Sequence, residues 1–421
     1  MNKRKILFIT TRLFDPPDSG RKVSLYHYCR GLHDVYDYEI YQYSFLESGQ
    51  KKADAEKRPS FIEEIVTASG VNFIGKLKNF IALSLFGKKF PFQCSLYYSQ
   101  ENAKRIVEYI EKVKPDVIIV DMIRLAQYIY AFENYNALKI FDCDDLLSKR
   151  YERQIQNTSN QAHFAGMYSN AMLSSIKNFM NLPFVRNAIL RAEIKRLKIW
   201  ERKFAEVYDK TILVSDTETE YLNEVLGEQK VHAIPTGVDV ELFSRLTVAN
   251  RDCEMLSFVG NFNVAANIDS LDMILNKIFP LIKHKVTLKV IGHCPKNIAE
   301  KYSGNVNVKF TGFVDDLQSE VTSTTVFLSP IAYGSGIKTK ILEAMAMKMP
   351  VVTNSIGAES ISAENGKYFF AYDDYAEIAR CVDDLLDNPE NAIDVTENGC
   401  RLVAEKYNWQ SIWENFKKME L

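Results

Sequence analysis

The chain has 421 residues, of which 47% are hydrophobic and 25% are charged, a composition typical of soluble globular proteins. Its net charge of −2 excludes a general attraction to nucleic acids or anionic lipids, so any basic surface must be local. Seven scattered cysteines without a Cys-x-x-Cys spacing argue against a disulfide framework or a zinc site and predict reduced thiols in a cytoplasmic protein. No apolar run reaches the ~18 residues of a membrane span, and the run at 6–9 is too short for a signal peptide.

Short apolar runs alternate with helical patterns along the first half of the chain. A buried strand is expected at 5–10, a proline-containing loop at 11–20 and a helix at 21–32. Further strands are expected at 38–43, 116–120, 138–141, 210–214 and 231–234. This alternation predicts a parallel sheet covered by helices on both faces.

A polar stretch at 244–253 predicts a linker, after which the alternation restarts. Strands are expected at 255–259, 286–291, 306–310, 326–329 and 351–353, and helices at 374–386, 391–407 and 409–419. Several of these strands end at a glycine, which is where open α/β sheets bind ligands. The pattern predicts two doubly wound α/β halves with a cleft between them.

Two basic segments depart from this plan. Residues 71–90 contain four lysines and no acidic residue. The apolar residues of this segment at helical spacing are Phe73, Ile74, Leu77, Phe80, Ile81 and Leu85. A basic amphipathic helix of this kind binds an anionic bilayer surface; the alternative is a helix that packs its apolar face on its own domain. The second basic helix, at 186–203, is typical of a solvated face.

The most informative segment follows the apolar run at 326–329. Gly334 and Gly336 let the backbone turn sharply and approach a ligand without a Cβ clash, and a helix starts near Lys338. Such a turn binds anions, because free N–H groups and the helix dipole point outward there. Lys338 and Lys340 add cations, and Glu343 lies one helical turn beyond Lys340. Cations for a diphosphate and a carboxylate for ribose hydroxyls predict a nucleotide-sugar site. The alternative is an ordinary strand-to-helix turn with solvated lysines.

At these positions the chain resembles the retaining glycosyltransferases of family 4, which have the GT-B fold, and particularly bacterial members that build surface polysaccharides. The resemblance covers nearly the whole chain and rests on segments at 18–21, 213–239, 257–269 and 336–352. It implies two doubly wound, Rossmann-like α/β domains facing a central cleft. The acceptor-side domain would span 1–243, the donor domain 252–405, and a C-terminal helix at 406–421 would return to the first domain.

The resemblance also implies a role for each matching residue. Glu343 would hold the ribose hydroxyls of a nucleoside diphosphate. Lys338 or Lys340 would neutralise the leaving diphosphate, where negative charge develops, which makes Lys338 and Glu343 candidate catalytic residues. Gly20 and Arg21, on the acceptor side, would reach across from the other domain and close the cleft. With His293, which follows Gly292 at the end of a predicted strand, the expected donor-binding set is Gly260, Asn261, Asn263, His293, Gly334, Ser335, Gly336, Ile337, Lys338, Thr339, Lys340 and Glu343.

Three departures from the family pattern matter. Ser335 stands eight positions before the helix glutamate, where many members have an acidic residue, so the identity of the transferred sugar does not follow. Asn263 and Asn267 stand in the region of the usual Arg and Lys phosphate pair, which moves the cationic role to the two lysines of the helix. Asp144 stands near the position of a family histidine.

Asp144 belongs to an acidic cluster at 142–145. Asp144 and Asp145 are candidate catalytic residues that would hydrogen-bond a sugar hydroxyl or the acceptor. Two other interpretations stay open. The carboxylates cap the next helix, or they bind Mn²⁺ and a diphosphate, as Asp-x-Asp motifs do in transferases of the other common fold. Because the donor motif lies in the second half, no metal is expected.

Together these features predict an enzyme, a cytoplasmic glycosyltransferase that moves a hexosyl or other glycosyl group from a nucleoside diphosphate sugar with retention. The expected acceptor is a glycan or a lipid-linked intermediate of capsule or O-antigen synthesis. The inner-membrane surface is an expected partner if the helix at 71–90 binds lipid; nucleic acid and cofactors are not expected. Two alternatives remain, a non-catalytic nucleotide-sugar-binding scaffold and a sugar-nucleotide epimerase of the same fold.

Overall fold

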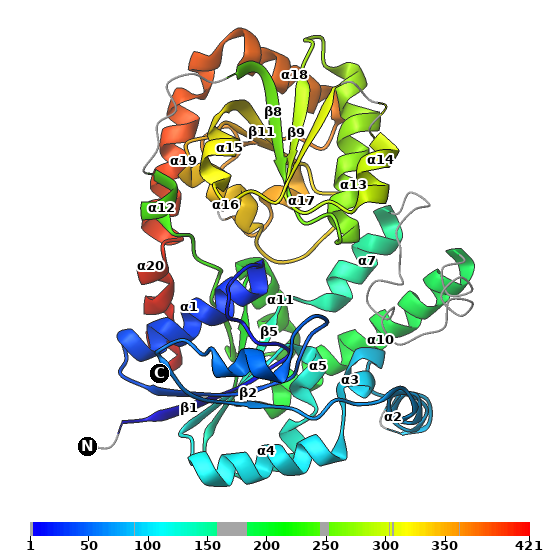
Figure 1. Cartoon of the computed structure of the whole chain (residues 1–421), viewed down its shortest axis with the longest axis vertical. Helices are drawn as coiled ribbons and strands as arrows, with labels where there is room; N and C mark the ends of the chain where they lie inside the picture. The colour runs from blue at the N-terminus through cyan, green and yellow to red at the C-terminus, as the bar shows by residue number, and fades with distance from the viewer. Residues whose placement is uncertain are drawn as a thin grey trace. The chain divides into compact units, whose positions relative to one another are not determined.

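The computed structural model describes residues 3–87, 89–157, 183–244, 252–302, 304, 307–361 and 363–421. These residues form two compact units (Figure 1). Unit 1 contains the described residues up to Glu152, those from 183 to Thr236, and Ile412–Leu421. Unit 2 contains residues 153–157 and the described residues of Gly237–Ser411. Most of the predicted linker, 245–251, and the lysine at position 88 lie outside the described residues.

Unit 1 is built on a seven-stranded parallel sheet with the order β3-β2-β1-β4-β5-β6-β7. Its strands are β1 (Lys5–Thr10), β2 (Glu39–Ser44), β3 (Ile62–Thr67), β4 (Val117–Asp121), β5 (Leu138–Asp144), β6 (Lys210–Leu213) and β7 (Val231–Ala233). The order reverses between β1 and β4, so right-handed crossovers place helices on both faces. Figure 1 shows α1 (Gly20–Asp34) and α4 (Gln100–Val113) on opposite faces of this sheet.

The remaining helices that begin in unit 1 are mostly short. They are η1 (Lys52–Glu56), α2 (Phe73–Asn79), η2 (Phe80–Phe86), α3 (Phe92–Tyr97), α5 (Ile123–Ala126), α6 (Ile129–Phe132), α7 (Leu147–Asn157), α10 (Pro183–Val207), α11 (Asp216–Leu226) and η7 (Asn415–Met419). The predicted strands are present within a few residues, but β3 escapes sequence reasoning. This edge strand is only partly buried and carries two glutamates, so it lacks the apolar run of a central strand.

The end of the chain packs in unit 1. The indole Nε1 of Trp413 donates to the carbonyl oxygen of His27 (2.8 Å). The Trp413 ring also fills the space beside Gly31, where an added Cβ would lie 2.3 Å from the ring. Phe416 meets the Tyr28 ring edge-on at 5.5 Å. These contacts tie Ile412–Leu421 to α1, far away in sequence.

Unit 2 contains a six-stranded parallel sheet with the order β10-β9-β8-β11-β12-β13. Its strands are β8 (Asp252–Val259), β9 (Thr287–Ile291), β10 (Val308–Gly312), β11 (Thr324–Leu328), β12 (Val351–Thr353) and β13 (Phe370–Ala371). Its helices are α12 (Val240–Ser244), α13 (Ala265–Met273), η4 (Ile274–Ile278), η5 (Phe279–Leu281), α14 (Lys296–Tyr302), α15 (Leu317–Thr322), α16 (Thr339–Ala346), α17 (Ser355–Ala358), α18 (Tyr375–Asp387), η6 (Pro389–Ala392), α19 (Ile393–Lys406) and α20 (Trp409–Glu414), the last running into unit 1.

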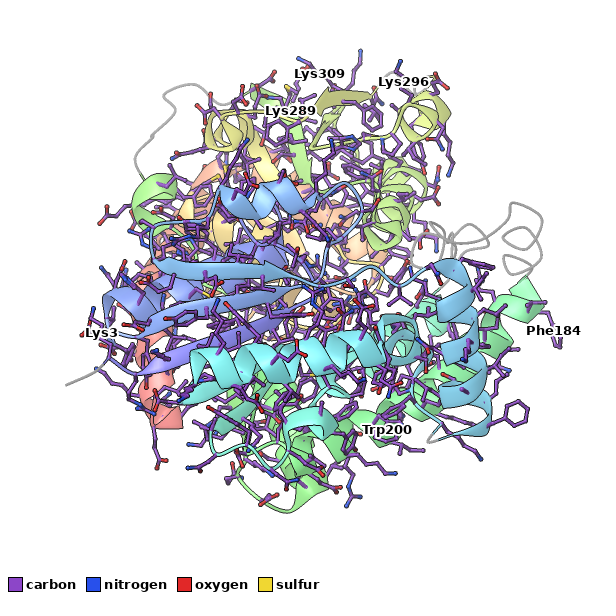
Figure 2. All side chains as sticks on the ribbon, turned by 60° about the horizontal axis from the view of Figure 1, so that its bottom comes forward. Lys3, Phe184, Trp200, Lys289, Lys296 and Lys309 are labelled. Carbon is purple, nitrogen blue, oxygen red and sulfur yellow. The ribbon has the colours of Figure 1, made fainter. Side chains whose placement is uncertain are left out.

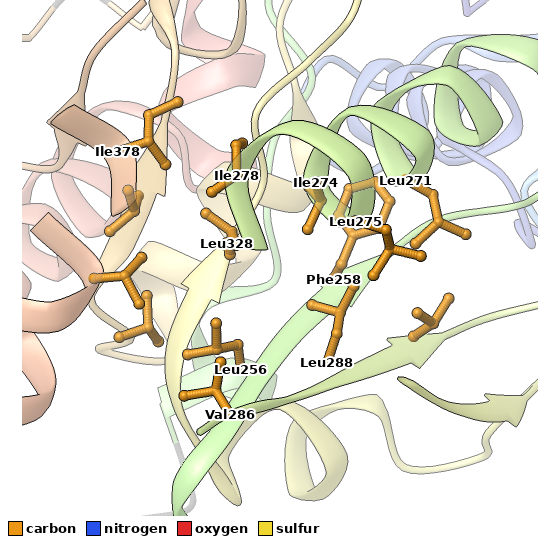
Figure 3. Close-up of a cluster of buried hydrophobic side chains, with 14 of the residues drawn as sticks. Leu256, Phe258, Leu271, Ile274, Leu275, Ile278, Val286, Leu288, Leu328 and Ile378 are labelled. Atoms are coloured by element: carbon orange, nitrogen blue, oxygen red, sulfur yellow. The ribbon is translucent and has the colours of Figure 1, made fainter. Parts of the chain in front are cut away.

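Alternating side chains of β11 face two hydrophobic clusters. Val326 and Leu328 join the cluster that α13, η4 and α18 form over one face of the sheet (Figure 3). Phe327 points the other way, into a cluster that includes Ile341 and Leu342 of α16. The period of two in a strand produces this division. With helices on both faces of each sheet, the prediction of two doubly wound α/β units is confirmed.

The predicted basic helix at 71–90 differs from the expectation. It is α2 followed by the π-helical η2, which ends at Phe86. Of the predicted apolar face, Phe80 is half-buried, and its ring lies 5.1 Å from the Phe92 ring at a tilt of 53°. Its other five members are exposed, as is Phe86: Phe73, Ile74, Leu77, Ile81 and Leu85. The alternative of an apolar face packed on its own domain is therefore not what unit 1 shows. No helix in the described ranges is long and apolar enough to cross a membrane.

Candidate nucleotide-sugar site and acidic cluster

The predicted donor-site residues lie at the carboxyl ends of neighbouring strands in unit 2. The order of this sheet reverses between β8 and β11, and open α/β sheets bind ligands at such a reversal because the loops diverge there. Residues 260–263 follow β8, residues 292–293 follow β9, and residues 329–338 follow β11. The fold thus brings three separate motifs to one edge of the sheet.

The turn between β11 and α16 presents backbone N–H groups. Gly336 has φ +62°, in the left-handed region that favours glycine. Lys338 is the N-cap of α16, and its own side chain does not cap the first turn of the helix. The first N–H groups of a helix have no acceptor within the helix, and the dipole makes this end positive. Ser335 is buried in the turn, whereas Ile337 and Thr339 are half-buried.

Lys338 folds back on this turn. Its Nζ donates to the carbonyl oxygens of Ser335 (2.9 Å) and Gly336 (2.6 Å). The ammonium group therefore lies within the turn that the sequence predicts to hold the diphosphate. Its predicted contact with that diphosphate stays a prediction.

Lys340 points from α16 toward the end of β8. Its Nζ donates to the carbonyl oxygen of Val259 (3.2 Å) and to Oδ1 of Asn267 (3.1 Å). It also lies 4.6 Å from the centre of the Phe258 ring. Burial, with a smaller effect of the Lys338 charge, lowers the pKa of Lys340 to about 7.

Glu343 is the carboxylate one helical turn beyond Lys340. Burial raises its pKa to about 7, against the opposing effect of Lys340. Perturbed groups in a crevice are candidates for function. A nearby ligand that carries hydroxyl donors and a negative diphosphate would favour the charged forms of Glu343 and Lys340 respectively.

Polar side chains after β8 and β9 form a small network at the same edge. Asn261 Oδ1 accepts from the backbone N–H of Asn263 (3.0 Å), and the Asn267 amide donates to the carbonyl oxygen of Asn261 (2.9 Å). The Asn263 amide lies 3.0 Å from Nδ1 of His293. An amide NH₂ only donates, so Nδ1 accepts and a neutral His293 carries its proton on Nε2.

We expect Gly292→Ala to destabilise unit 2 by about 2 kcal/mol or more, because two costs combine. Gly292 has φ +121°, and an added Cβ would lie 2.2 Å from the carbonyl oxygen of Gly260. Urea unfolding would measure the change. The control Gly366→Ala shares a positive φ (+78°) but has open space around the Cβ among the described residues, so it isolates the backbone term. Equal losses in the two variants would contradict the close approach of Gly292 and Gly260.

Unit 1 holds an arginine among three aspartates, at the strand ends where its own sheet order reverses. Arg21 Nη2 lies 2.6 Å from Asp121 Oδ1 and 2.8 Å from Asp142 Oδ2. Its Nη1 lies 3.3 Å from Asp144 Oδ1. Thr11 adds two hydrogen bonds to Asp121 Oδ2, from its backbone N–H (2.9 Å) and its hydroxyl (2.6 Å).

Burial and the neighbouring charges change the pKa values of the three aspartates in this cluster. Burial raises the pKa of Asp142 to about 6, although Arg21 opposes the shift. Burial also raises the pKa of Asp144, again against Arg21. For Asp121, burial is outweighed by Arg21, Arg12 and the Thr11 hydrogen bonds, which lower its pKa. Three carboxylates thus share one guanidinium, and two of them, Asp142 and Asp144, keep a proton more readily than a free aspartate.

This arrangement revises the predicted acceptor-side roles. Gly20 is the first residue of α1, but the Arg21 side chain is only 7% exposed and is bound to carboxylates of its own unit. The structure therefore does not support an Arg21 that reaches out of its domain. Asp145 is buried and paired with Arg150. Asp144, with its side chain 19% exposed, is the more accessible of the two predicted aspartates.

The described residues offer no side-chain cluster that supports the metal-binding alternative. Among the described residues no group of three or more His, Cys, Asp or Glu side chains is arranged to hold a metal ion. In the Arg21 cluster the guanidinium supplies the positive charge.

Two residues of these sites, Asp121 and Asn267, are not predicted as site residues by the sequence. Asp121 ends the apolar run of β4, and a polar residue at that position was the available signal. The sequence marks Asn267 only as a replacement for a basic residue, whereas in the structure its Oδ1 accepts from Lys340 of α16. Neither contact can be derived from sequence spacing.

Comparison with solved structures defines the class of fold. The chain is similar to a glycosyltransferase from Rickettsia africae (15% identity, 100% of this chain and 98% of that chain, TM-score 0.65). It is also similar to HepE from Anabaena in complex with UDP and glucose (13% identity, 99% of each chain, TM-score 0.64). Together with the two doubly wound units, these similarities show the GT-B fold.

The second half of the chain matches a glycosyltransferase family model. Residues 254–388 match the family model described as glycosyl transferases group 1. An uncharacterized 44.6 kDa protein in the cps region of Klebsiella pneumoniae is 26% identical over 40% of this chain and 46% of its own length. The capsular polysaccharide biosynthesis glycosyltransferase CapM of Staphylococcus aureus is 27% identical over 27% of this chain and 30% of its own length. The matched regions span less than half of these relatives.

Proposed function

We propose that the protein is a glycosyltransferase that moves a sugar from a nucleoside diphosphate sugar to a glycan or lipid-linked acceptor, with retention at the anomeric carbon. One observation carries the proposal. Lys340 of α16 bonds the end of β8 and Asn267 of α13 at the strand-order reversal of unit 2, and Glu343 interacts electrostatically with Lys340. This arrangement combines anion donors with a half-buried carboxylate, which suits a nucleoside diphosphate.

The comparisons support the same proposal. The group 1 match covers the unit that contains this site, HepE was solved with UDP and glucose, and CapM is named for capsular polysaccharide biosynthesis. The proposal includes a role in bacterial surface polysaccharide synthesis, at the cytoplasmic face of the membrane. Retention rests on the resemblance of residues 336–352 to retaining enzymes, and the anomeric configuration of the product, measured by NMR, tests it.

In the proposed reaction the bond between the anomeric carbon and the diphosphate oxygen breaks, and the diphosphate leaves with the electron pair. The N–H groups of the α16 turn and the lysines stabilise the charge that develops there. The acceptor hydroxyl oxygen bonds to the anomeric carbon, and its proton passes to the oxygen of the departing diphosphate. We propose Asp144 as an acceptor-side residue, since it is the partly exposed carboxylate of the unit 1 cluster.

Binding of a nucleoside diphosphate should raise the thermal unfolding midpoint. At about 100 times the Kd, one ligand adds about 2.7 kcal/mol, which corresponds to roughly 5 °C or more for a unit of this size. A panel of UDP, GDP, ADP and their sugars would identify the donor, and Glu343→Ala should lose most of the shift. If none of these nucleotides changes the midpoint, the donor site is wrong.

The same panel separates the alternatives. Nucleotide-sugar binding without turnover, across glycan and lipid-linked acceptors, would identify a scaffold. Ser335 gives a reason for this test, because it stands where many family members have an acidic residue. Conversion of the donor sugar without an acceptor would identify an epimerase.

A further inference from the structure

One guanidinium in unit 2 joins two loops at the edge of the sheet that holds the candidate donor site. Arg153 belongs to the part of α7 that lies in unit 2. Its Nη1 donates to the carbonyl oxygen of Gly334 (2.7 Å), in the turn after β11. Its Nη2 donates to Oε1 of Glu359 (2.8 Å), and its Nη1 also bonds Oε2 of the same carboxylate. Glu359 follows α17, the helix after β12, so the Arg153 side chain links the loops of two neighbouring strands.

The contact between Arg153 and Glu359 fixes the guanidinium in place. A guanidinium that meets a carboxylate through two parallel N–H···O bonds is held in both distance and orientation. The two side chains are 20% and 19% exposed, so the pair is largely shielded from water. Because the carboxylate offsets the charge of the guanidinium, the bond to Gly334 acts mainly through its geometry.

Two cations together hold three consecutive carbonyl oxygens of the turn. Arg153 bonds that of Gly334, and Lys338 bonds those of Ser335 and Gly336. In a planar trans peptide the C=O and the N–H point in opposite directions. The N–H groups of residues 335–337 therefore point away from the cation that holds the oxygen of the same peptide. Successive N–H groups oriented by the backbone form concave sites for anions.

We propose that Arg153 is a positioning residue of the donor site, which holds the turn at 334–337 so that its N–H groups meet the diphosphate of the nucleotide sugar. The inference rests on the proposed function, because a nucleoside diphosphate must bind at this turn. Arg153 itself needs no contact with the ligand, since its donors are directed to Gly334 and Glu359. Arg153 and Gly334 are 181 residues apart, so no local motif contains both.

The two glycines of the turn explain why it needs an anchor. Gly336 has φ +62°, and glycine has more conformational freedom to lose on ordering than any other residue. A turn released from Arg153 would sample other conformations, and the ligand would have to order it again at a loss of affinity. Asn354 separately anchors the start of this loop, because its side-chain amide bonds the N–H and the carbonyl oxygen of Ile331 (2.9 Å each). Loss of Arg153 should therefore release the turn and leave the rest of the loop in place.

Titration calorimetry of the full chain with UDP, GDP and ADP tests the inference. For the nucleotide that the wild type binds, Arg153→Met should raise the Kd about tenfold, because ordering one residue costs about as much free energy as a tenfold change in affinity. Arg153→Lys keeps a donor for Gly334 but loses the paired bonds to Glu359. Its Kd should therefore lie between those of the wild type and Arg153→Met.

Lys289→Met is the matched control, and Lys289 is labelled in Figure 2. Its Nζ pairs with the carboxylate of Glu320 (2.6 Å) and donates to the carbonyl oxygen of Glu320 (3.2 Å) and to Oγ of Ser323 (2.9 Å). Like Arg153, it thus bonds a carboxylate and a backbone carbonyl in unit 2, but these partners lie outside the donor turn. Both substitutions should lower the unfolding midpoint, whereas only Arg153→Met should raise the Kd.

The outcomes separate this inference from the proposed function. An unchanged Kd in Arg153→Met, beside a wild type that binds nucleotide, would overturn the inference and leave the proposed function in place. An equal rise of the Kd in Lys289→Met would also overturn it, because the effect would then follow stability and not the turn. A wild-type chain that binds none of the nucleotides would refute the proposed function, and this inference with it.

Discussion

Glu343→Ala is expected to lower kcat/KM for transfer from the accepted nucleoside diphosphate sugar by about 100-fold or more. A half-buried carboxylate that accepts two ribose hydroxyls makes two charge-assisted hydrogen bonds, each contributing about 1.5–3 kcal/mol. Loss of about 3 kcal/mol corresponds to about a 100-fold effect. Steady-state release of the nucleoside diphosphate, with the donor that the thermal-shift panel identifies, measures it.

Two further variants sharpen this test. Glu343→Gln keeps the shape and one acceptor oxygen but loses the charge, so its loss should be smaller than that of Glu343→Ala. Glu397→Ala removes an exposed carboxylate from α19 in the same unit and should stay within about threefold of wild type. A Glu343→Ala enzyme with normal kcat/KM would show that this carboxylate does not contact the donor.

Arg21→Met should reduce the free energy of unfolding by about 3–5 kcal/mol, the usual cost of leaving buried charges unpaired. The substitution keeps an apolar stem of similar length but removes the cation that Asp121, Asp142 and Asp144 share. Urea unfolding measures the loss. Arg30→Met removes an exposed arginine from the same helix, and its effect should stay within about 0.5 kcal/mol.

The loss in Arg21→Met should also depend on pH in a defined direction. Without the guanidinium, the buried carboxyls have pKa values above those of the unfolded chain, so the folded state binds more protons. Stability then falls as pH rises through the folded pKa values, and the destabilisation should be larger at about pH 8 than at about pH 5. Adding Asp142→Asn should restore part of the stability, since Asp142 already has a pKa raised to about 6. A loss that is independent of pH would indicate lost packing and not unpaired charge.

The two units use the same position in the sheet for different chemistry. In each, side chains gather at the carboxyl ends of the strands where the strand order reverses. In unit 2 this edge presents N–H donors and a lysine of lowered pKa, whereas in unit 1 it presents carboxylates around one arginine. Anion binding and hydroxyl binding are the respective uses that these charges favour.

The sequence alone determined the two parallel sheets, because each central strand is a short apolar run between polar loops and each run is separated by a helical pattern. It also identified Gly334, Gly336, Lys338, Lys340 and Glu343 as one local motif, since a glycine turn and one helical turn are encoded by spacing. Edge strands such as β3 were missed because they are only half-buried and need fewer apolar residues.

Only the tertiary structure decided which partner each charged group meets. Spacing places Arg21 near the start of a helix, but its three aspartates come from β4 and β5, more than ninety residues away. The pKa of Lys340 likewise depends on burial against Phe258 and Val259 of β8, which a local pattern does not contain. The apolar stripe at 71–90 reads the same whether it packs inward or faces outward, because periodicity records which residues share a face and not what covers that face. The packing of α10 beside η2 leaves that face exposed.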